Sequence, residues 1–461
     1  SLIALLSYPV LFEPVLTVAA QGVLWTLLFS VYALACGTCV WQLWGEERTT
    51  RQTAITKPAS DVESPRPTRT RVALWLVLPA LASVMLLATT NHVCQNLPPT
   101  PFLWVVPLSL YLLTFIISFD SERWYVRSAF GALPLGACFL LSLRTNAWFA
   151  QQYLSQTLIC FAPLFCVCML CHGELVRLKP PPRYLTFFYL MCSAGGAAGG
   201  MLVALACPWL LDSYFEMNLC NAMGFALAAT VLAHETGVLT RSSNGQSSFS
   251  HGPNTFPLRA GGACLLGLGV LMIVNAELNK PAYSATEAAK RNFYGVVSIK
   301  SDATDKPGER LTAMVHGQII HGVQFNSAER RREPTTYYHQ NSGVGRTLRW
   351  FNEQRDAPLH IGAVGMGAGT IAVYGRPYDR YRFYEINPAV VEFAEQYFSF
   401  VSDCDAHTTI VPGDARLSLE NESPQQFDVL VLDAFSGDAV PAHLLTTEAM
   451  AVYIRHLKKN G

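Results

Sequence analysis

Long apolar runs dominate the chain up to about residue 278, and shorter apolar segments separated by polar ones follow. A helix needs about 20 consecutive apolar residues to cross a bilayer, and many of the early runs approach or exceed that length. The later segments have the alternating or short-run pattern of strands and helices in a folded domain. The pattern therefore predicts an integral membrane region followed by a soluble region.

The membrane region is expected to contain eight full spans after an apolar segment, residues 1–12, that is too short to cross. The expected spans are residues 15–44, 72–90, 102–119, 128–143, 154–171, 185–210, 215–234 and 261–274. Residues 45–71 are polar and rich in Pro, Thr and Arg, which predicts a disordered loop. The short first segment predicts that a helix began before the sequence given.

Lys and Arg gather in alternate loops of this region, and basic loops usually stay on the cytoplasmic side. The basic loops are residues 45–71, 120–127, 177–183 and 241–259. The loops between them, such as residues 91–101, carry neither Lys nor Arg. Following this alternation, the last span leaves the soluble region on the non-cytoplasmic side.

The soluble region is organised around a glycine-rich turn after a short apolar strand. From Leu359 to Thr370 the chain places Gly362, Gly365 and Gly367 where the strand ends and a helix is expected to begin. Glycine lets the backbone turn tightly and approach a ligand, and a helix N-terminus offers unpaired N–H groups. One such loop is a weak signal by itself.

Acidic residues at the ends of the next strands strengthen that signal. Glu385 follows Gly365 by twenty residues, the spacing at which a carboxylate can bind the ribose hydroxyls of a nucleoside. Asp414, which precedes Ala415, and Asp433 end the third and fourth expected strands. Each acid could be a simple turn or helix cap. The ordered series instead predicts a doubly wound α/β sheet with a nucleoside across its carboxyl edge.

Other elements of the soluble region follow from local pattern. Strands are expected at residues 408–411 and 427–432, and Asn387-Pro388 is expected to begin a helix that ends near residue 398. Residues 292–299 and 311–325 alternate in the manner of strands, which predicts a small antiparallel sheet before the doubly wound one.

The composition of the chain argues against nucleic acid as a binding partner. The chain has 461 residues, 14% of them charged and 51% hydrophobic, and a formal net charge of zero, so it has no basic footprint for nucleic acid. Only Cys404 of the thirteen cysteines lies in the soluble region. Cys36 and Cys39 form a CxxC inside an expected span, where helix packing is favoured over zinc or redox chemistry. No metal site is expected.

Three polar residues in the membrane region have two possible roles. His172, Glu174 and Glu216 lie at expected span edges, where they mark a ligand site or simply a solvated helix end. Residues 193–200 are all Ser, Ala or Gly, and small residues spaced four apart predict close packing of two helices.

The soluble region resembles the spermidine synthases, the polyamine aminopropyltransferases. The resemblance is carried by Tyr338-His339, the glycine loop, Tyr384-Glu385, Gly413-Asp414-Ala415 and residues 433–438. The whole chain is similar to bacterial membrane proteins that fuse a multi-span, transporter-like region to such a domain. This similarity implies an integral protein of the bacterial inner membrane.

The fold class expected from pattern and resemblance is a multi-span α-helical membrane bundle, then a small antiparallel sheet, then an α/β Rossmann-like domain of the S-adenosylmethionine-dependent methyltransferase type. The expected parts are residues 1–278, 279–345 and 346–461, the last incomplete at its C-terminal end.

The resemblance also implies roles for single residues. Glu385 binds the ribose of S-adenosylmethionine or its decarboxylated form, and Asp414 binds the adenine amino group. The remaining residues implied to contact this cosubstrate are Gly362, Gly365, Gly367 and Ala415. No tightly bound cofactor is expected.

On the acceptor side, the resemblance implies that Asp433 is the catalytic carboxylate and that Asp438, Tyr338 and His339 bind an amine. The family carries an aspartate in the glycine loop that holds the aminopropyl amine, whereas this chain has Gly367-Ala368 there. The donor tail must therefore be bound differently.

Three functions remain open at this stage. The first is a membrane-anchored, spermidine-synthase-like transferase that acts on an adenosyl sulfonium and a small-molecule amine. The second is a non-catalytic subunit that uses the Rossmann-like domain to dock within a homo-oligomer or a larger membrane complex. The third, transport of polyamines through the bundle, has little support because few acids lie near the spans.

Overall fold

The computed structural model describes residues 2–50, 66–96, 103–131, 133, 153–235, 285–301, 309–317, 319–435 and 440–461. The expected span at residues 261–274 and most of that at residues 128–143 lie outside the described residues. The predicted boundaries after residues 278 and 345 remain predictions.

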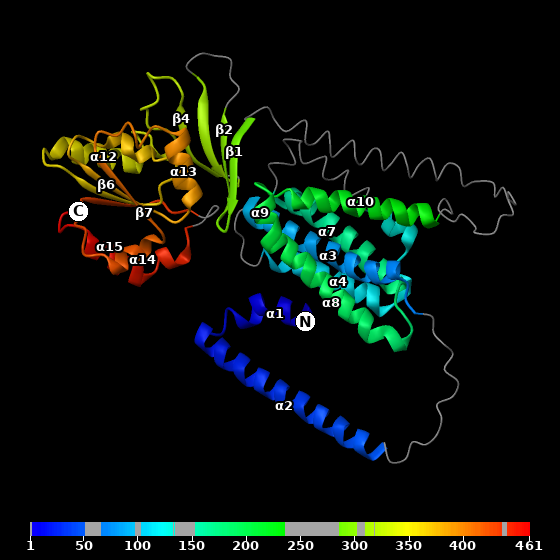
Figure 1. Cartoon of the computed structure of the whole chain (residues 1–461). Coiled ribbons are helices and arrows are strands. Elements are labelled where there is room, and N and C mark those ends of the chain that lie inside the picture. The colour runs from blue at the N-terminus through cyan, green and yellow to red at the C-terminus, as the bar shows by residue number, and fades with distance from the viewer. Residues whose placement is uncertain are drawn as a thin grey trace.

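The N-terminal part of the chain is helical (Figure 1). Its helices and helical turns are α1 Leu2–Ser7, η1 Tyr8–Phe12, α2 Val18–Thr50, α3 Arg69–Asn96, α4 Val105–Asp120, η2 Glu122–Trp124, α7 Tyr153–Arg177, η4 Pro182–Tyr184, α8 Leu185–Met201, η5 Leu202–Ala206, α9 Cys207–Leu210 and α10 Glu216–Glu235. Both described edges of the polar stretch at residues 45–71 are helical, because α2 continues to Thr50 and α3 begins at Arg69.

Four stretches of the described helices are long and apolar enough to cross a membrane, and this agrees with a membrane location. They are Val18–Gln42, Arg69–Gln95, Cys160–Arg177 and Pro182–Leu210. Leu2–Phe12 and Val105–Asp120 are apolar but shorter. α10 covers the expected span at residues 215–234 without reaching this standard. Within the described chain, fewer segments therefore qualify as spans than the sequence pattern predicted.

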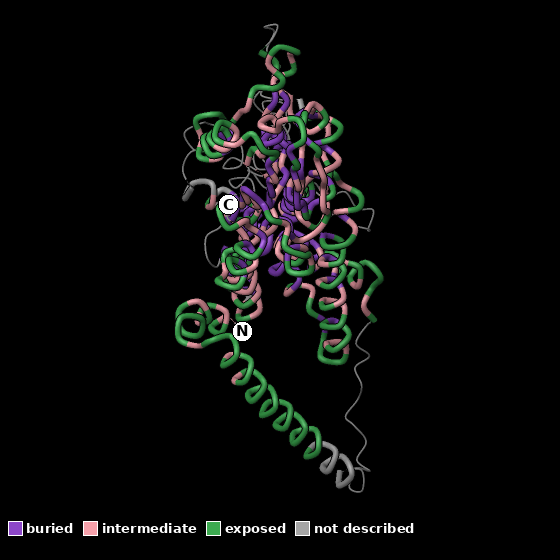
Figure 2. Tube along the Cα trace, turned by 90° about the vertical axis from the view of Figure 1, so that its left-hand side faces the viewer, coloured by how far each residue is buried: buried purple, intermediate pink, exposed green. Residues whose placement is uncertain are grey.

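Packing within the bundle depends on small residues where two helices approach closely. A side chain at Gly195 or Gly199 of α8 would overlap the backbone carbonyl of Leu76 or Ala80 in α3. This confirms the packing role predicted for residues 193–200. α2 lies apart from the other helices with its side chains exposed, whereas buried residues concentrate in the bundle and in the α/β part (Figure 2).

The small antiparallel sheet is present in the order β1-β2-β3-β4. Its strands are β1 Ala285–Asn292, β2 Gly295–Ser301, β3 Leu311–His316 and β4 Ile319–Phe325. The strand expected at residues 292–299 begins later, at Gly295, because the chain turns at Phe293 and Tyr294 and pairs Asn292 with Gly295. The hydrophobic pattern did not predict this hairpin, because its turn residues are aromatic and continue the pattern of a strand.

The second sheet is parallel, in the order β7-β6-β5-β8, as a doubly wound domain requires. Its strands are β5 His360–Val364, β6 Arg380–Glu385, β7 His407–Pro412 and β8 Val429–Leu432. The accompanying helices and turns are η6 Thr336–Tyr338, α12 Gly343–Gln354, η7 Thr370–Tyr374, α13 Pro388–Tyr397, α14 Ala415–Asn421, η8 Ala442–Leu444 and α15 Thr447–His456. Asn387 caps α13 by accepting the N–H of Ala389, as predicted.

One expected element differs. The glycine loop leads into η7, a five-residue 3₁₀ helix, and not into a longer helix. Gly369, at φ +80°, precedes it, and Ile371 and Ala372 bury their side chains in the core. The glycine loop therefore has no long helix behind it whose N-terminus could face a ligand.

The small sheet joins the bundle to the parallel sheet (Figure 1). Arg291 of β1 places Nη2 2.8 Å from Oε1 of Glu216, the first residue of α10, and both side chains are almost fully buried. The guanidinium also lies 4.4 Å from the ring centroid of Tyr214. On the other side of the hairpin, Asn292 donates to Oδ1 of Asn387 at 2.6 Å. These contacts place the second sheet at a defined end of the helical bundle.

Candidate functional site

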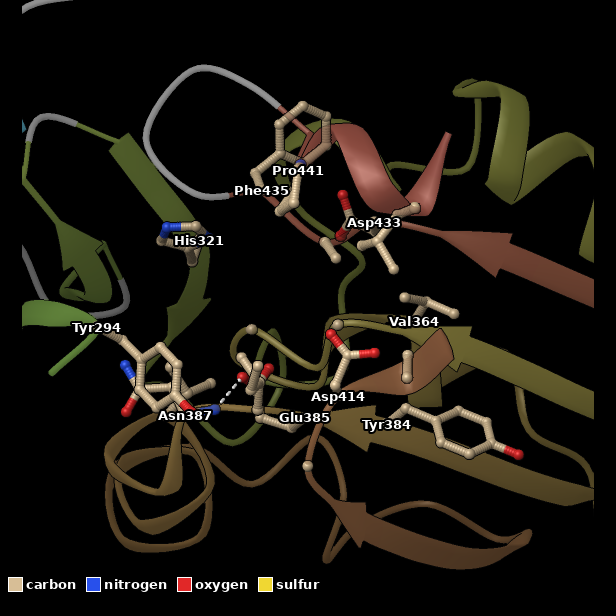
Figure 3. A pocket seen from close by; sticks show the side chains of 18 of the residues that line it. Tyr294, His321, Val364, Tyr384, Glu385, Asn387, Asp414, Asp433, Phe435 and Pro441 are labelled. Carbon is tan, nitrogen blue, oxygen red and sulfur yellow. Dashed lines mark hydrogen bonds between the residues drawn. The ribbon is translucent and has the colours of Figure 1, made fainter. Parts of the chain in front are cut away.

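A pocket opens at the carboxyl ends of β5, β6, β7 and β8, and the small sheet forms its opposite wall (Figure 3). Gly365, Glu385, Asp414 and Asp433 come from the four strand ends, so one pocket unites acids that lie far apart in the sequence. Residues of the small sheet that line it are Tyr294, His316 and His321.

Two positions of the glycine loop require glycine for two reasons: the backbone has a positive φ, and a neighbouring carbonyl leaves no space for a side chain. Gly365 has φ +92°, and a side chain there would overlap the carbonyl of Asp433. Gly367 has φ +53°, and a side chain there would lie 2.6 Å from the carbonyl of His321. Gly362 lies inside β5 against Leu430 and does not line the pocket. Two of the three predicted glycines therefore lie at the site, and the third packs in the sheet.

Glu385 ends β6 with its carboxylate buried beside the glycine loop. Oε2 accepts the backbone N–H of Met366 at 3.0 Å, and Oε1 accepts that of Asn387 at 2.8 Å. Burial raises the pKa of Glu385, and the backbone N–H groups oppose the rise. Each oxygen keeps a further lone pair that can accept from a ligand hydroxyl.

Asp414 ends β7 and begins α14. Oδ1 accepts the N–H of Leu417 at 2.9 Å, and Oδ2 lies 2.8 Å from Nε2 of His443. Burial alone would raise the pKa of Asp414, but the Leu417 N–H and His443 outweigh it and lower the pKa. Ala415, the next residue, also lines the pocket. The Asp414 carboxylate is therefore held in place at the wall of the pocket.

Asp433 ends β8 and faces the pocket across from Glu385 (Figure 3). Its carboxylate accepts a hydrogen bond from the hydroxyl of Tyr338, whose own carbonyl accepts from Tyr374 at 2.6 Å. Burial raises the pKa of Asp433 to about 6, and the hydroxyls of Tyr338 and Tyr337 oppose the rise. This carboxylate can accept a proton near neutral pH more readily than an ordinary aspartate.

Not every predicted residue reaches the site. His339 is exposed, and its Nδ1 accepts from the backbone N–H of Asn341 at 3.3 Å. It does not line the pocket. Asp438 lies outside the described residues, so its predicted role stays a prediction.

Sequence reasoning missed four polar residues of the pocket. His316 and His321 lie within residues 311–325, which were expected only to form strands, and Asn387 was expected only to begin a helix. His443 follows Asp414 by 29 residues, for which no spacing rule exists. In the described part of the chain, no three His, Cys, Asp or Glu residues are grouped to hold a metal ion.

No protein-family model matches the chain. A polyamine aminopropyltransferase of Vibrio vulnificus is 32% identical over 111 residues, which cover 23% of this chain and 36% of that protein. An N-terminal histidine N-methyltransferase of Emericella nidulans is 33% identical over 112 residues, 23% of this chain and 19% of that protein. The chain thus spans about a third or less of the length of these relatives.

Among solved structures, a probable spermidine synthase from Corynebacterium glutamicum is 20% identical, with a TM-score of 0.31, and the match covers 38% of this chain and 60% of that one. A segment of this chain is therefore homologous to spermidine synthases and methyltransferases, and its relatives are transferases. The parallel sheet and its pocket are consistent with that class.

Proposed function

We propose that this chain is a membrane-anchored transferase that moves an alkyl group from an adenosyl sulfonium to an amine. The proposal is carried by one observation: Glu385, Asp414 and Asp433 reach a single pocket at the carboxyl edge of a parallel sheet. The proteins that match a segment of this chain include an aminopropyltransferase and a methyltransferase. The two enzymes transfer different groups, but in both cases an alkyl carbon is transferred.

The nucleoside half of the site is formed by two of these acids. The free lone pairs of Glu385 would accept the ribose hydroxyls beside the glycine loop, and Asp414 would accept from the adenine amino group. Ala415 and the absence of side chains at Gly365 and Gly367 leave space for the nucleoside. A nucleoside bound in this way would have its sulfonium near Asp433.

Asp433 would act as the base. A free alkyl amine has a pKa of about 10, close to that of lysine, so it must lose a proton before it attacks. Asp433, oriented by the Tyr338 hydroxyl, accepts that proton. The amine nitrogen forms a bond to the carbon beside sulfur, the carbon–sulfur bond breaks, and sulfur keeps the electron pair as a neutral thioether. No acid is needed for the leaving group.

The test is turnover by the purified full-length chain with labelled S-adenosylmethionine and its decarboxylated form, offered with amine acceptors. Asp433→Asn should lower turnover by at least about 100-fold, because it removes a general base, while methylthioadenosine still binds. Asp356→Asn, at an exposed position, serves as the matched control and should leave turnover unchanged. Turnover by Asp433→Asn at the wild-type rate would contradict the proposed role.

A further inference from the structure

The pocket lies next to the ends of two candidate membrane spans. The spans Arg69–Gln95 and Pro182–Leu210 both end on the side of the bundle that meets the small sheet. A side chain at Gly317 would overlap the carbonyl of Gln95, and one at Gly295 would lie 3.1 Å from Oε1 of Gln95. The last residue of a span therefore contacts the sheet that forms a wall of the pocket.

The residues in this contact are pocket residues or their neighbours. Gly295 follows Tyr294, and His316 precedes Gly317; Tyr294 and His316 both line the pocket. The end of the span therefore lies beside residues that are sequence neighbours of the pocket lining. The buried Arg291–Glu216 ion pair, two residues before the β1–β2 turn, fixes this hairpin to the start of α10.

The surface at this end is apolar. Phe293, at the tip of the β1–β2 hairpin, is 95% exposed and packs edge-on against Tyr294. Trp209 is 85% exposed at the end of its span, and Phe215 is half-exposed just before α10. Exposed aromatic residues at the ends of spans are typical of the layer where lipid headgroups meet water. Phe293 is thus an exposed aromatic residue directly before Tyr294, which lines the pocket.

The pocket itself also has exposed apolar residues in its lining. Ile386 and Phe435 both line the pocket and are 41% and 45% exposed. Phe293, Ile386 and Phe435, which we call the apolar rim, come from the small sheet and from the ends of β6 and β8. The three side chains offer no counter-charge to the ammonium groups of a polyamine, whereas a long acyl chain would bury more apolar surface against them.

We propose that the acceptor is an amine-bearing lipid, which enters the pocket from the bilayer surface with its headgroup amine toward Asp433 and its chains along the apolar rim. This inference rests on the proposed function and specifies its acceptor. The chemistry is unchanged: the lipid nitrogen forms the new bond to carbon, the carbon–sulfur bond breaks, sulfur leaves as a thioether, and the amine proton passes to Asp433.

The experiment uses the full-length chain in phosphatidylcholine vesicles with or without phosphatidylethanolamine, and a donor labelled in the transferable group. Label should enter the lipid fraction only when phosphatidylethanolamine is present, at a rate at least about tenfold above that of a soluble diamine at equal amine concentration. Phe293→Ser should reduce lipid labelling about tenfold. Ile454→Ser changes a similarly exposed apolar residue on α15 and should leave labelling unchanged.

Methylthioadenosine binding separates failure of the inference from failure of the proposed function. Equal or faster labelling of the soluble diamine, or lipid labelling that Phe293→Ser leaves unchanged, would overturn the lipid acceptor while the transferase stands. If the vesicles show no transfer to either amine and the chain does not bind methylthioadenosine, both proposals fail. If Phe293→Ser loses methylthioadenosine binding as well, Phe293→Tyr, which keeps the ring, should restore binding and labelling; failure to do so would also overturn the inference.

Discussion

Buried charges are arranged differently in the helical bundle and around the pocket. In the bundle and at its edge, Glu174 lies 2.6 Å from the guanidinium of Arg127, and Glu216 lies 2.8 Å from that of Arg291. Around the pocket, the carboxylates of Glu385 and Asp433 accept hydrogen bonds from neutral backbone N–H or hydroxyl groups. Neither makes a described ion pair.

This difference separates structural from functional groups. A buried charge with a counter-charge is satisfied, and its removal leaves the partner buried and unpaired. A buried carboxylate with only neutral partners keeps capacity for a ligand or a proton, and such groups gather in functional sites. By this criterion we expect Glu174 and Glu216 to serve the structure, and Glu385 and Asp433 to serve binding and chemistry.

The largest effect is expected from breaking a structural pair. Arg291→Met leaves Glu216 buried without its counter-charge and should cost about 3–5 kcal/mol of stability, measured by denaturant unfolding of the full chain. Lys290→Met is the control, because Lys290 and its partner Glu392 are largely exposed, and it should cost less than about 1 kcal/mol.

Replacing both members of the buried pair, as Arg291→Met with Glu216→Leu, should recover most of the lost stability. Equal costs for Arg291→Met and Lys290→Met would show that the buried pair is not structural.

A smaller effect is expected from the protonation of Asp433, whose pKa burial raises to about 6. Turnover should fall about tenfold per pH unit below that value, because the base becomes protonated. The free energy of unfolding should instead increase as the pH falls. The folded state binds this proton more tightly than the unfolded state, so the contribution is full below pH ~4 and is lost as pH rises through about 6.

Comparison of Asp433→Asn with the wild type checks both signs. Unfolding curves at pH 5 and pH 7 should show the stability change in the wild type and its absence in the variant. A wild-type turnover rate that is flat between these pH values would contradict the assignment of Asp433 as the base.

The sequence predicted the parallel sheet and the acids at its edge because these depend on local pattern. Short apolar runs marked β5 to β8, and the polar residue after each run marked the strand end. The approach of Glu385, Asp414 and Asp433 then followed from the rule that parallel strands present their carboxyl ends at one edge.

The remaining features depend on contacts between distant segments. Arg291 and Glu216 are 75 residues apart, and nothing in their local sequence pairs them. His316 and His321 reach the pocket only because β4 packs on the glycine loop, where Ala368 donates to the His321 carbonyl at 3.4 Å. The β1–β2 hairpin was missed because its turn residues, Phe293 and Tyr294, are apolar and extend the strand pattern.

We propose that the pocket binds an adenosyl nucleoside through Glu385. The most direct measurement is calorimetric titration of methylthioadenosine into the full-length chain, because this ligand carries the nucleoside without a transferable tail. We expect affinity in the micromolar range that Glu385→Gln weakens at least about tenfold, since charge-assisted hydrogen bonds to the ribose are lost. Glu353→Gln, at an exposed position of α12, should bind as the wild type does. Absence of binding, or binding that Glu385→Gln leaves unchanged, would contradict the account.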